Sequence, residues 1–257
     1  MIDLHCHVLP GVDDGVTTLG DAIELARAAA AEGVTAIAAT PHVRDDYPTT
    51  ADTMEAGVAA LDAALTREGV DVRILPGGEL AIDHVSKLDD AELRRFGLGG
   101  NPNLLLVEFP YYGWPLELGG LVLDLRTRGI VPLIAHPERN AEVRADPERL
   151  RPLVAGGAFV QVTAASVDGR LGARAQAGAL QLVELGLAHV IASDAHHPSV
   201  RAFGIAAARD AVGDAALARW LTDDVPRALV AGAEPPPPPS EASVRGRTRL
   251  FGRPRGH

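Results

Sequence analysis

Histidines and carboxylates recur in this sequence at short spacings that suit metal binding. His5 and His7 are two residues apart, as are Asp194 and His196, and each pair closes a short apolar run. Residues two apart on a strand point to the same face, so both members of a pair can reach one cation. Imidazole nitrogens and carboxylates together suit zinc, manganese, iron and similar first-row metals.

Further side chains of the same kinds stand at or just beyond the ends of other apolar runs. Each one alone is weak evidence, because paired histidines can be satisfied by backbone carbonyls and a glutamate can cap a helix. Their joint occurrence is the stronger signal if the runs are strands that end at one face of the fold. The nine candidate ligands are His5, His7, Asp14, His42, Glu79, Glu108, His136, Asp194 and His196.

The elements that must position these residues alternate along the chain. Short β-rich runs are followed by longer helical patterns, which predicts βα units and a parallel sheet. The fold class is therefore α/β, and seven strands alternating with helices favour a distorted (β/α)7 TIM-like barrel over an open doubly wound sheet. We expect strands at 2–7, 35–40, 72–75, 104–109, 131–135, 159–163 and 189–193, and helices at 18–32, 51–68, 116–128, 147–155, 173–185 and 199–211.

Composition narrows the class of protein. The chain has 257 residues, a formal net charge of −10 and one cysteine, Cys6. The negative charge argues against nucleic-acid binding, and the single cysteine excludes an intrachain disulfide and fits a reducing cytoplasm. There is no apolar run long enough to span a membrane and no export signal at the N-terminus, so we expect a cytoplasmic protein without membrane insertion.

The C-terminal segment differs from the rest. Residues 235–239 are all proline, and the chain ends in an arginine-rich stretch. Such a run is extended and cannot enter a helix or a sheet interior. We expect one catalytic domain over residues 1–232 and a disordered tail over 233–257, which is either an interaction arm or a solvated appendage.

The ordered motifs resemble the polymerase-and-histidinol-phosphatase (PHP) superfamily. More narrowly, they resemble the bacterial metal-dependent protein-tyrosine phosphatases of capsular and exopolysaccharide biosynthesis. The resemblance covers residues 1 to about 232 and lies in DLHCHVLPGVDDG (3–15), ATPH (39–42), GGE (77–79), EFP (108–110), AHPER (135–139) and SDAH (193–196).

The resemblance implies the PHP fold, a distorted seven-stranded barrel, holding three divalent ions. These are most often manganese, with iron or zinc as alternatives. By this resemblance one ion takes His5, His7, Glu79 and Asp194, a second shares Glu79 and takes Glu108 and His136, and a third takes Asp14, His42 and His196.

Two arginines correspond to the phosphate-binding positions of the family. Arg139 lies in the HPER motif, and Arg201 follows the last histidine motif. The alternative for Arg139 is a salt bridge to Glu138 or Asp146. A metal-activated hydroxide would attack phosphorus while these cations neutralise the phosphoryl oxygens, so no cysteine nucleophile is needed.

Three aromatic residues, Tyr111, Tyr112 and Trp114, follow the EFP motif and form either a rim for a phosphotyrosine ring or a packed loop cluster. The predicted activity is hydrolysis of phosphotyrosine on a bacterial tyrosine kinase that regulates polysaccharide synthesis. The alternatives are a small-molecule phosphatase of the histidinol-phosphate type and a non-catalytic PHP module that binds partners.

Overall fold

The computed structural model describes residues 1–199 and 202–239. All seven strands expected from the sequence are present, together with three short ones that we did not predict. The strands are β1 (Ile2–Cys6), β2 (Ala36–Ala39), β3 (His42–Arg44), β4 (Tyr47–Pro48), β5 (Arg73–Leu75), β6 (Glu79–Ala81), β7 (Leu104–Glu108), β8 (Val131–Ile134), β9 (Phe159–Thr163) and β10 (Val190–Ala192).

The strands form two sheets in which almost every pair is parallel. One sheet has the order β1-β2-β5 and the other the order β10-β9-β8-β7-β6-β3-β4, with β3 and β4 antiparallel. The end of β1 meets the segment after β10, because His7 N donates to Ala195 O at 2.9 Å and Asp194 N donates to His5 O at 2.8 Å. The protein thus has a mixed α/β fold built on parallel strands, as expected.

Prolines divide two strands of this arrangement. Pro41 separates β2 from β3 and Pro76 separates β5 from β6, because proline has no N–H to donate to a sheet. The chain nevertheless continues alongside its neighbours: Thr40 N donates to Cys6 O at 3.0 Å, and Glu79 N donates to Pro41 O at 3.0 Å. His42 and Glu79 therefore begin short strands, whereas the sequence predicted that they follow the ends of longer ones.

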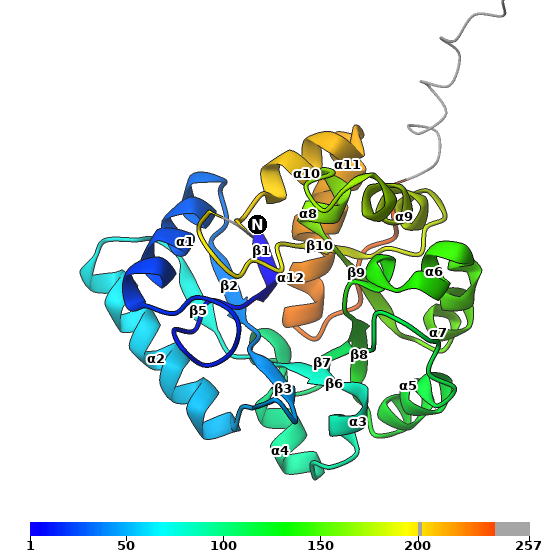
Figure 1. Ribbon diagram of the computed structural model, residues 1–257, viewed down its shortest axis with the longest axis horizontal. Coiled ribbons are helices and arrows are strands. Elements are labelled where there is room, and N and C mark those ends of the chain that lie inside the picture. The colour runs from blue at the N-terminus through cyan, green and yellow to red at the C-terminus, as the bar shows by residue number, and fades with distance from the viewer. Residues whose placement is uncertain (200–201, 240–257) are drawn as a thin grey trace, which may run out of the picture.

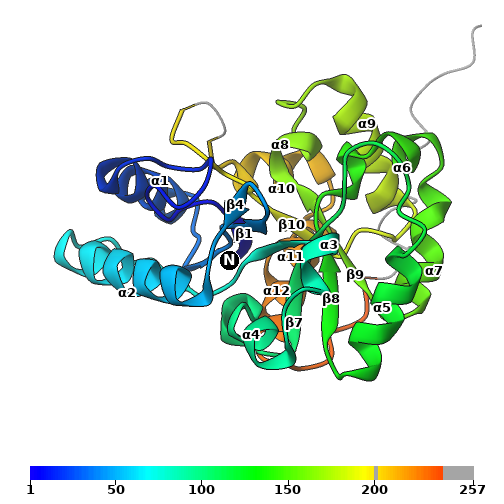
Figure 2. The same cartoon turned by 60° about the horizontal axis from the view of Figure 1, so that its bottom comes forward.

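The helices lie around the outside of the strands (Figure 1), and α1 and α2 run side by side in the turned view (Figure 2). The α-helices are α1 (Leu19–Ala31), α2 (Ala51–Arg67), α3 (Ile82–Val85), α4 (Asp90–Arg95), α5 (Leu118–Thr127), α6 (Ala141–Ala145), α7 (Arg151–Ala155), α8 (Ala164–Val167), α9 (Ala173–Glu184), α10 (Ile205–Val212), α11 (Ala215–Arg219) and α12 (Val225–Val230). The 3₁₀ turns are η1 (Leu98–Gly100), η2 (Pro137–Arg139) and η3 (Pro147–Leu150), and η4 (Trp220–Asp224) is a π-helix.

Local signals account for the helix ends that the sequence predicted. At the start of α1, Thr18 caps the helix, because its Oγ1 accepts a hydrogen bond from Asp21 N at 3.1 Å. Gly33, just after this helix, has a φ of 85° that favours glycine. The helix predicted over 199–211 was wrong at its beginning: Gly204, with a φ of 132°, precedes α10, which starts only at Ile205.

The strands supply most of the core. Every residue of β1, β2, β7 and β10 is buried, and the buried faces of α1 and α2 consist largely of alanine and leucine. Within residues 1–199 and 202–239, the helices are all too short or too polar to cross a membrane. Beyond residue 232 the described chain continues to 239, and Trp220 Nε1 donates to Pro236 O at 2.8 Å. The rest of the predicted tail, 240–257, lies outside the described residues.

Candidate metal centre

The two histidines of the first motif stand side by side at the end of β1. Their Nε2 atoms are 3.2 Å apart, and both side chains are buried. Cys6, between them, points away into the core and donates to Ala195 O at 3.6 Å, as the two-residue alternation predicted. The paired nitrogens therefore face one common space.

Two other candidate ligands have a left-handed backbone. His136 has a φ of 31° and Asp194 a φ of 50°, and these are the non-glycine residues with positive φ in the described chain. This conformation costs free energy for residues with a side chain, and it persists where the surrounding structure enforces it, often at functional sites. The turn after β8 and the turn after β10 thus each use strained backbone to aim a ligand inward.

Glu79 lies at the centre of the donor atoms. Its Oε2 is 3.3 Å from the Nε2 atoms of both His5 and His7. The same oxygen is 3.0 Å from His42 Nδ1, and Oε1 lies 2.8 Å from His136 Nε2. One buried carboxylate therefore contacts imidazoles from β1, β3 and the turn after β8, a position suited to bridging neighbouring cations.

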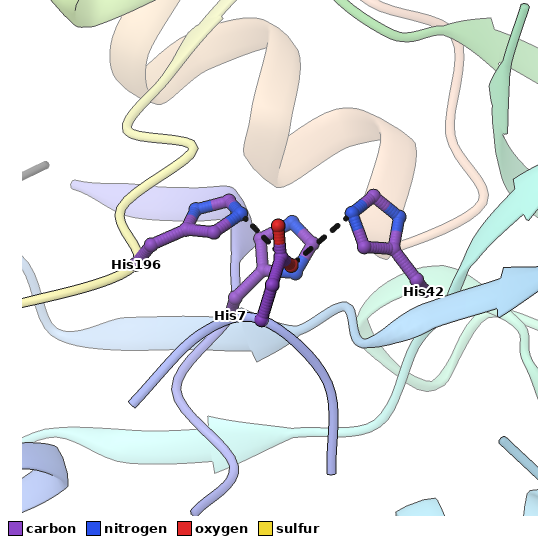
Figure 3. A group of neighbouring side chains, drawn as sticks. His7, His42 and His196 are labelled. Atoms are coloured by element: carbon purple, nitrogen blue, oxygen red, sulfur yellow. Dashed lines mark ion pairs between the residues drawn. The ribbon is translucent and has the colours of Figure 1, made fainter. Parts of the chain in front are cut away.

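Asp14 gathers a second set of histidines near the surface. Its Oδ1 is 3.4 Å from the Nε2 atoms of His42 and His196. Figure 3 shows these two rings and that of His7 around the carboxylate, with the ion pairs dashed. The Asp14 side chain is 39% exposed, so this set opens toward solvent while the Glu79 set is enclosed.

All nine predicted ligands belong to donor groups close enough to share a cation. Within each group the ligand atoms lie within 4.8 Å of one another. The groups are His7, Asp14, His42 and His196; His5, Glu79 and His136; His5, His7 and Asp194; and His42, Glu79 and Glu108. These groups overlap, because each of His5, His7, His42 and Glu79 belongs to two of them.

The electrostatics of the site favour positive charge. Burial alone would lower the pKa of His7, but the neighbouring carboxylates of Asp13 and Glu79 outweigh it and raise this pKa to about 10. Burial would lower the pKa of His42 too, whereas Asp14 and Glu79 raise it to about 9. Protons on these rings compensate the carboxylates, and a bound cation would take over that role.

Hydrogen bonding gives a further test of whether a cation fits. His42 Nδ1 and Glu79 Oε2 are 3.0 Å apart and buried, yet neither has a hydrogen-bond partner of acceptable geometry among the described residues. Buried polar atoms are nearly always satisfied in proteins. A cation shared by these two atoms would satisfy both, so the donor set fits the divalent ions that the sequence implied.

Two residues that support the ligands were not assigned a role from the sequence. Asp13 Oδ2 accepts from His7 Nδ1 at 2.7 Å and from His42 N at 2.9 Å. Gln161 Oε1, on β9, contacts His5 Nδ1 at 3.1 Å and accepts from His136 N at 3.2 Å. The adjacent acidic pair was a usable signal for Asp13, whereas a glutamine inside an apolar strand gave no signal for Gln161.

Arg139 reaches the same centre. Its Nη1 donates to Asp194 Oδ2 at 2.8 Å, and its guanidinium lies 4.5 Å from the centre of the Tyr111 ring. The partner is therefore neither Glu138 nor Asp146, the two acids considered as alternatives. Glu138 turns away and accepts from Thr163 N and the Ser166 hydroxyl at 2.9 and 2.7 Å. Arg201 lies outside the described residues.

The donor atoms open into a cavity of about 180 Å³. Arg139 and Tyr111 line this cavity together with Arg44 and six of the predicted ligands. The other two aromatic candidates differ: Tyr112 is 81% exposed, and Trp114 packs edge-on against Phe109 with ring centres 6.0 Å apart. Of the three aromatic residues, Tyr111 is the one placed beside the predicted ligands.

The arrangement defines a class of protein: an α/β fold with overlapping groups of histidine and carboxylate donors and an arginine beside them. The family described as capsular polysaccharide synthesis, CpsB/CapC, matches residues 1–220. The chain belongs to this family.

Named relatives and a solved structure agree with this assignment. The tyrosine-protein phosphatase YwqE of Bacillus subtilis (strain 168) is 39% identical over 204 residues, covering 79% of this chain and 80% of YwqE. The putative tyrosine-protein phosphatase CapC of Staphylococcus aureus is 34% identical over 206 residues, covering 79% and 80%. A crystal structure from work on YwqE and on CpsB from Streptococcus pneumoniae, described as unique metal-dependent tyrosine phosphatases, matches with a TM-score of 0.84 and 35% identity, covering 93% of this chain and 100% of that chain.

Proposed function

We propose that this protein is a metal-dependent protein-tyrosine phosphatase that hydrolyses phosphotyrosine on a bacterial tyrosine kinase regulating capsular or exopolysaccharide synthesis. Membership of the CpsB/CapC family and the phosphatase names of its relatives support this proposal. The observation that carries it is the convergence of the nine donor residues beside Arg139 around one small cavity.

We further propose that the strands close into a distorted (β/α)7 barrel. If β2 and β3 count as one interrupted strand and β5 and β6 as another, seven strands remain. The hydrogen bonds between the β1 end and the segment after β10 join the two outer members. In such barrels the carboxyl ends of the strands carry the active site. Four donors lie at or just after strand ends, namely His7, Glu108, His136 and Asp194, whereas His42 and Glu79 lie within the two interrupted strands.

Three divalent ions, manganese in the first instance, would be held by the ligand sets that the sequence suggested. Glu79 would serve two of them, and Asp14, His42 and His196 would hold the outermost one. When bound, such cations acidify water and neutralise phosphoryl oxygens. Nitrogen and oxygen donors also accept iron or zinc, so the cellular supply decides the native metal.

The chain's own side chains would then orient the substrate. Arg139 offers N–H donors in a planar fork, which matches the geometry of phosphoryl oxygens. Asp194 and the Tyr111 ring hold this guanidinium in place through a hydrogen bond and a cation–π contact. The Tyr111 ring, which lines the cavity, also offers a flat apolar surface to the aromatic ring of phosphotyrosine.

The proposal is tested by phosphate release from a phosphotyrosyl peptide and from histidinol phosphate, with the purified protein in manganese and after chelation. We expect chelator-sensitive turnover of the peptide and little turnover of histidinol phosphate. A preference for histidinol phosphate would replace the proposal with a small-molecule phosphatase. Absence of metal-dependent turnover of either substrate would leave a non-catalytic binding module.

A further inference from the structure

A second, larger cavity adjoins the metal centre. It has a volume of about 490 Å³ and lies over β3, β6, the start of α3 and the loop after β7. Arg44 and Tyr111 line both this cavity and the smaller one that holds the ligands. We call this larger cavity the flank groove. If the phosphate of a ligand lies at the predicted metal ligands, the rest of the ligand would extend between Arg44 and Tyr111 into the flank groove.

The flank groove has an apolar floor. Ala81, Ile82, Phe109 and Pro110 contribute to its lining. Ile82 and Phe109 are almost completely buried beneath it. A floor of this kind can pack against side chains and an extended backbone on either side of a phosphorylated residue. It offers little to a substrate as small as histidinol phosphate, which the 180 Å³ cavity alone can hold.

The rim of the flank groove is acidic. Asp45, Asp46, Asp83 and Glu117 line it, against one basic lining residue, Arg44. The Arg44 guanidinium is already engaged, since its Nε is 2.9 Å from Asp46 Oδ1 and its Nη1 is 3.4 Å from Glu108 Oε2. The positive charge of Arg44 is therefore already neutralised by Asp46 and Glu108.

Two of the four rim acids, Asp83 and Glu117, are less compensated by neighbouring cations than Asp45 and Asp46 are. Lys87 Nζ lies 2.6 Å from Asp45 Oδ1 but 4.0 Å from Asp83 Oδ2, so it neutralises the former more than the latter. Glu117 precedes α5, makes no side-chain cap hydrogen bond and has no ion-pair partner in the part of the chain that the structure describes. Glu117 is thus the rim carboxylate most free to pair with an incoming cation.

From this arrangement we propose that the flank groove binds the polypeptide on one side of the phosphotyrosine and selects substrates that carry lysine or arginine there. The inference rests on the proposed function and specifies its substrate class. The flank groove is continuous with the cavity that holds the predicted ligands, so a peptide bound there extends from the phosphotyrosine. The apolar floor packs against this peptide. The negative charge of the rim that no cation neutralises favours basic over acidic side chains. Glu117 is the specificity-determining residue.

The test uses three phosphotyrosyl peptides that differ only in having lysine, alanine or glutamate around the phosphotyrosine. p-Nitrophenyl phosphate serves as a small substrate that does not reach the flank groove. We expect kcat/KM to fall from the lysine to the alanine to the glutamate peptide, by up to about fivefold per ion pair gained or lost, mainly through KM. The preference shrinks at high salt, because the pairs are exposed.

Charge reversal locates the effect. Glu117→Lys removes or inverts the preference for the lysine peptide while turnover of p-nitrophenyl phosphate stays at the wild-type level. Asp71→Lys is the matched control, because Asp71 is an exposed acid in the loop before β5, at the opposite end of the strands from the metal ligands. This control variant keeps the wild-type peptide preference.

The inference is overturned if the wild-type protein treats the three peptides alike, or if Glu117→Lys changes their ranking no more than Asp71→Lys does. Failure of the proposed function has a different signature. In that case the wild-type protein hydrolyses neither the peptides nor p-nitrophenyl phosphate in a chelator-sensitive manner.

Discussion

Gly15 offers a sharp test of how closely the proposed metal ligands are held. A Cβ atom at this position would lie 2.3 Å from His7 O and 2.6 Å from His7 Cβ, with Asp13 Oδ1 at 3.0 Å. All three atoms belong to backbone or to side chains fixed by hydrogen bonds. Gly15→Ala therefore cannot be accommodated by rotating a flexible neighbour.

The required displacement follows from these distances. Ordinary contacts of a Cβ begin near 3.4 Å, so the loop that carries Gly15 must move by about 1 Å. The movement falls on Asp13, which holds His7 and the backbone of His42, and on Asp14, a candidate ligand itself. A misplacement of 1 Å in a catalytic constellation costs on the order of 100-fold in rate, and we expect a loss of that size in kcat/KM.

The assay combines turnover of p-nitrophenyl phosphate with calorimetric titration of manganese into the chelated protein. Gly120→Ala is the matched control, because Gly120 is exposed in α5 and a Cβ there meets nothing within 4 Å. It retains full activity and gains about 0.4–1 kcal/mol of stability, since alanine reduces the entropy of the unfolded chain. Wild-type activity and manganese affinity in Gly15→Ala would refute the reasoning.

Three further predictions concern Gln161, Arg139 and His189. Gln161→Leu removes the acceptor that orients His5 and lowers manganese affinity by about 10- to 100-fold in calorimetry, whereas Gln161→Glu retains most of it. Arg139→Ala lowers kcat/KM for phosphotyrosyl peptide by on the order of 10²- to 10³-fold while metal content by mass spectrometry is unchanged. Burial lowers the pKa of His189 to about 4, so the unfolded state binds more protons between pH 6.5 and 4. Stability in urea is thus full above pH 6.5 and falls by up to roughly 3 kcal/mol toward pH 4, and His189→Gln flattens this slope.

Each of these predictions has a contradicting result. Equal manganese affinity in wild type and Gln161→Leu would remove the orienting role of Gln161. Unchanged peptide kinetics in Arg139→Ala would separate this arginine from the phosphoryl group. An identical pH slope in His189→Gln would show that the buried imidazole, which accepts from Val160 N at 3.2 Å, is not what titrates.

The sequence predicted the strands and the donor residues better than their local surroundings. Hydrophobic runs and the two-residue spacing of His5 and His7 are local signals, and parallel strands bring their ends together whatever the details of the turns. The same signals could not reveal that Pro41 and Pro76 interrupt two strands while the chain keeps its direction. The sequence therefore predicted correctly that His42 lies beside the other donors. It placed His42 beyond the end of a strand, whereas His42 begins β3.

Contacts between distant residues account for most of what was missed. The partner of Arg139 is Asp194, 55 residues away, because the turn after β8 and the turn after β10 meet across β9. Gln161 contacts two ligands from different strands, and nothing in its own neighbourhood in the sequence indicates this role. The flank groove likewise needs β3, α3 and the loop after β7 in place before its rim charges can be recognised.

The junction between β1 and the segment after β10 has a consequence for how the protein is made. His5 and His7 leave the ribosome well before Asp194 and His196, because 189 residues separate the two pairs (194 − 5 and 196 − 7). The hydrogen bonds of Ser193 to Asp3, from N at 2.9 Å and from Oγ at 2.5 Å, form only when the two meet. A nascent chain that has not yet reached residue 196 can therefore assemble at most a partial donor set, and the complete set requires that the segment after β10 has folded against β1.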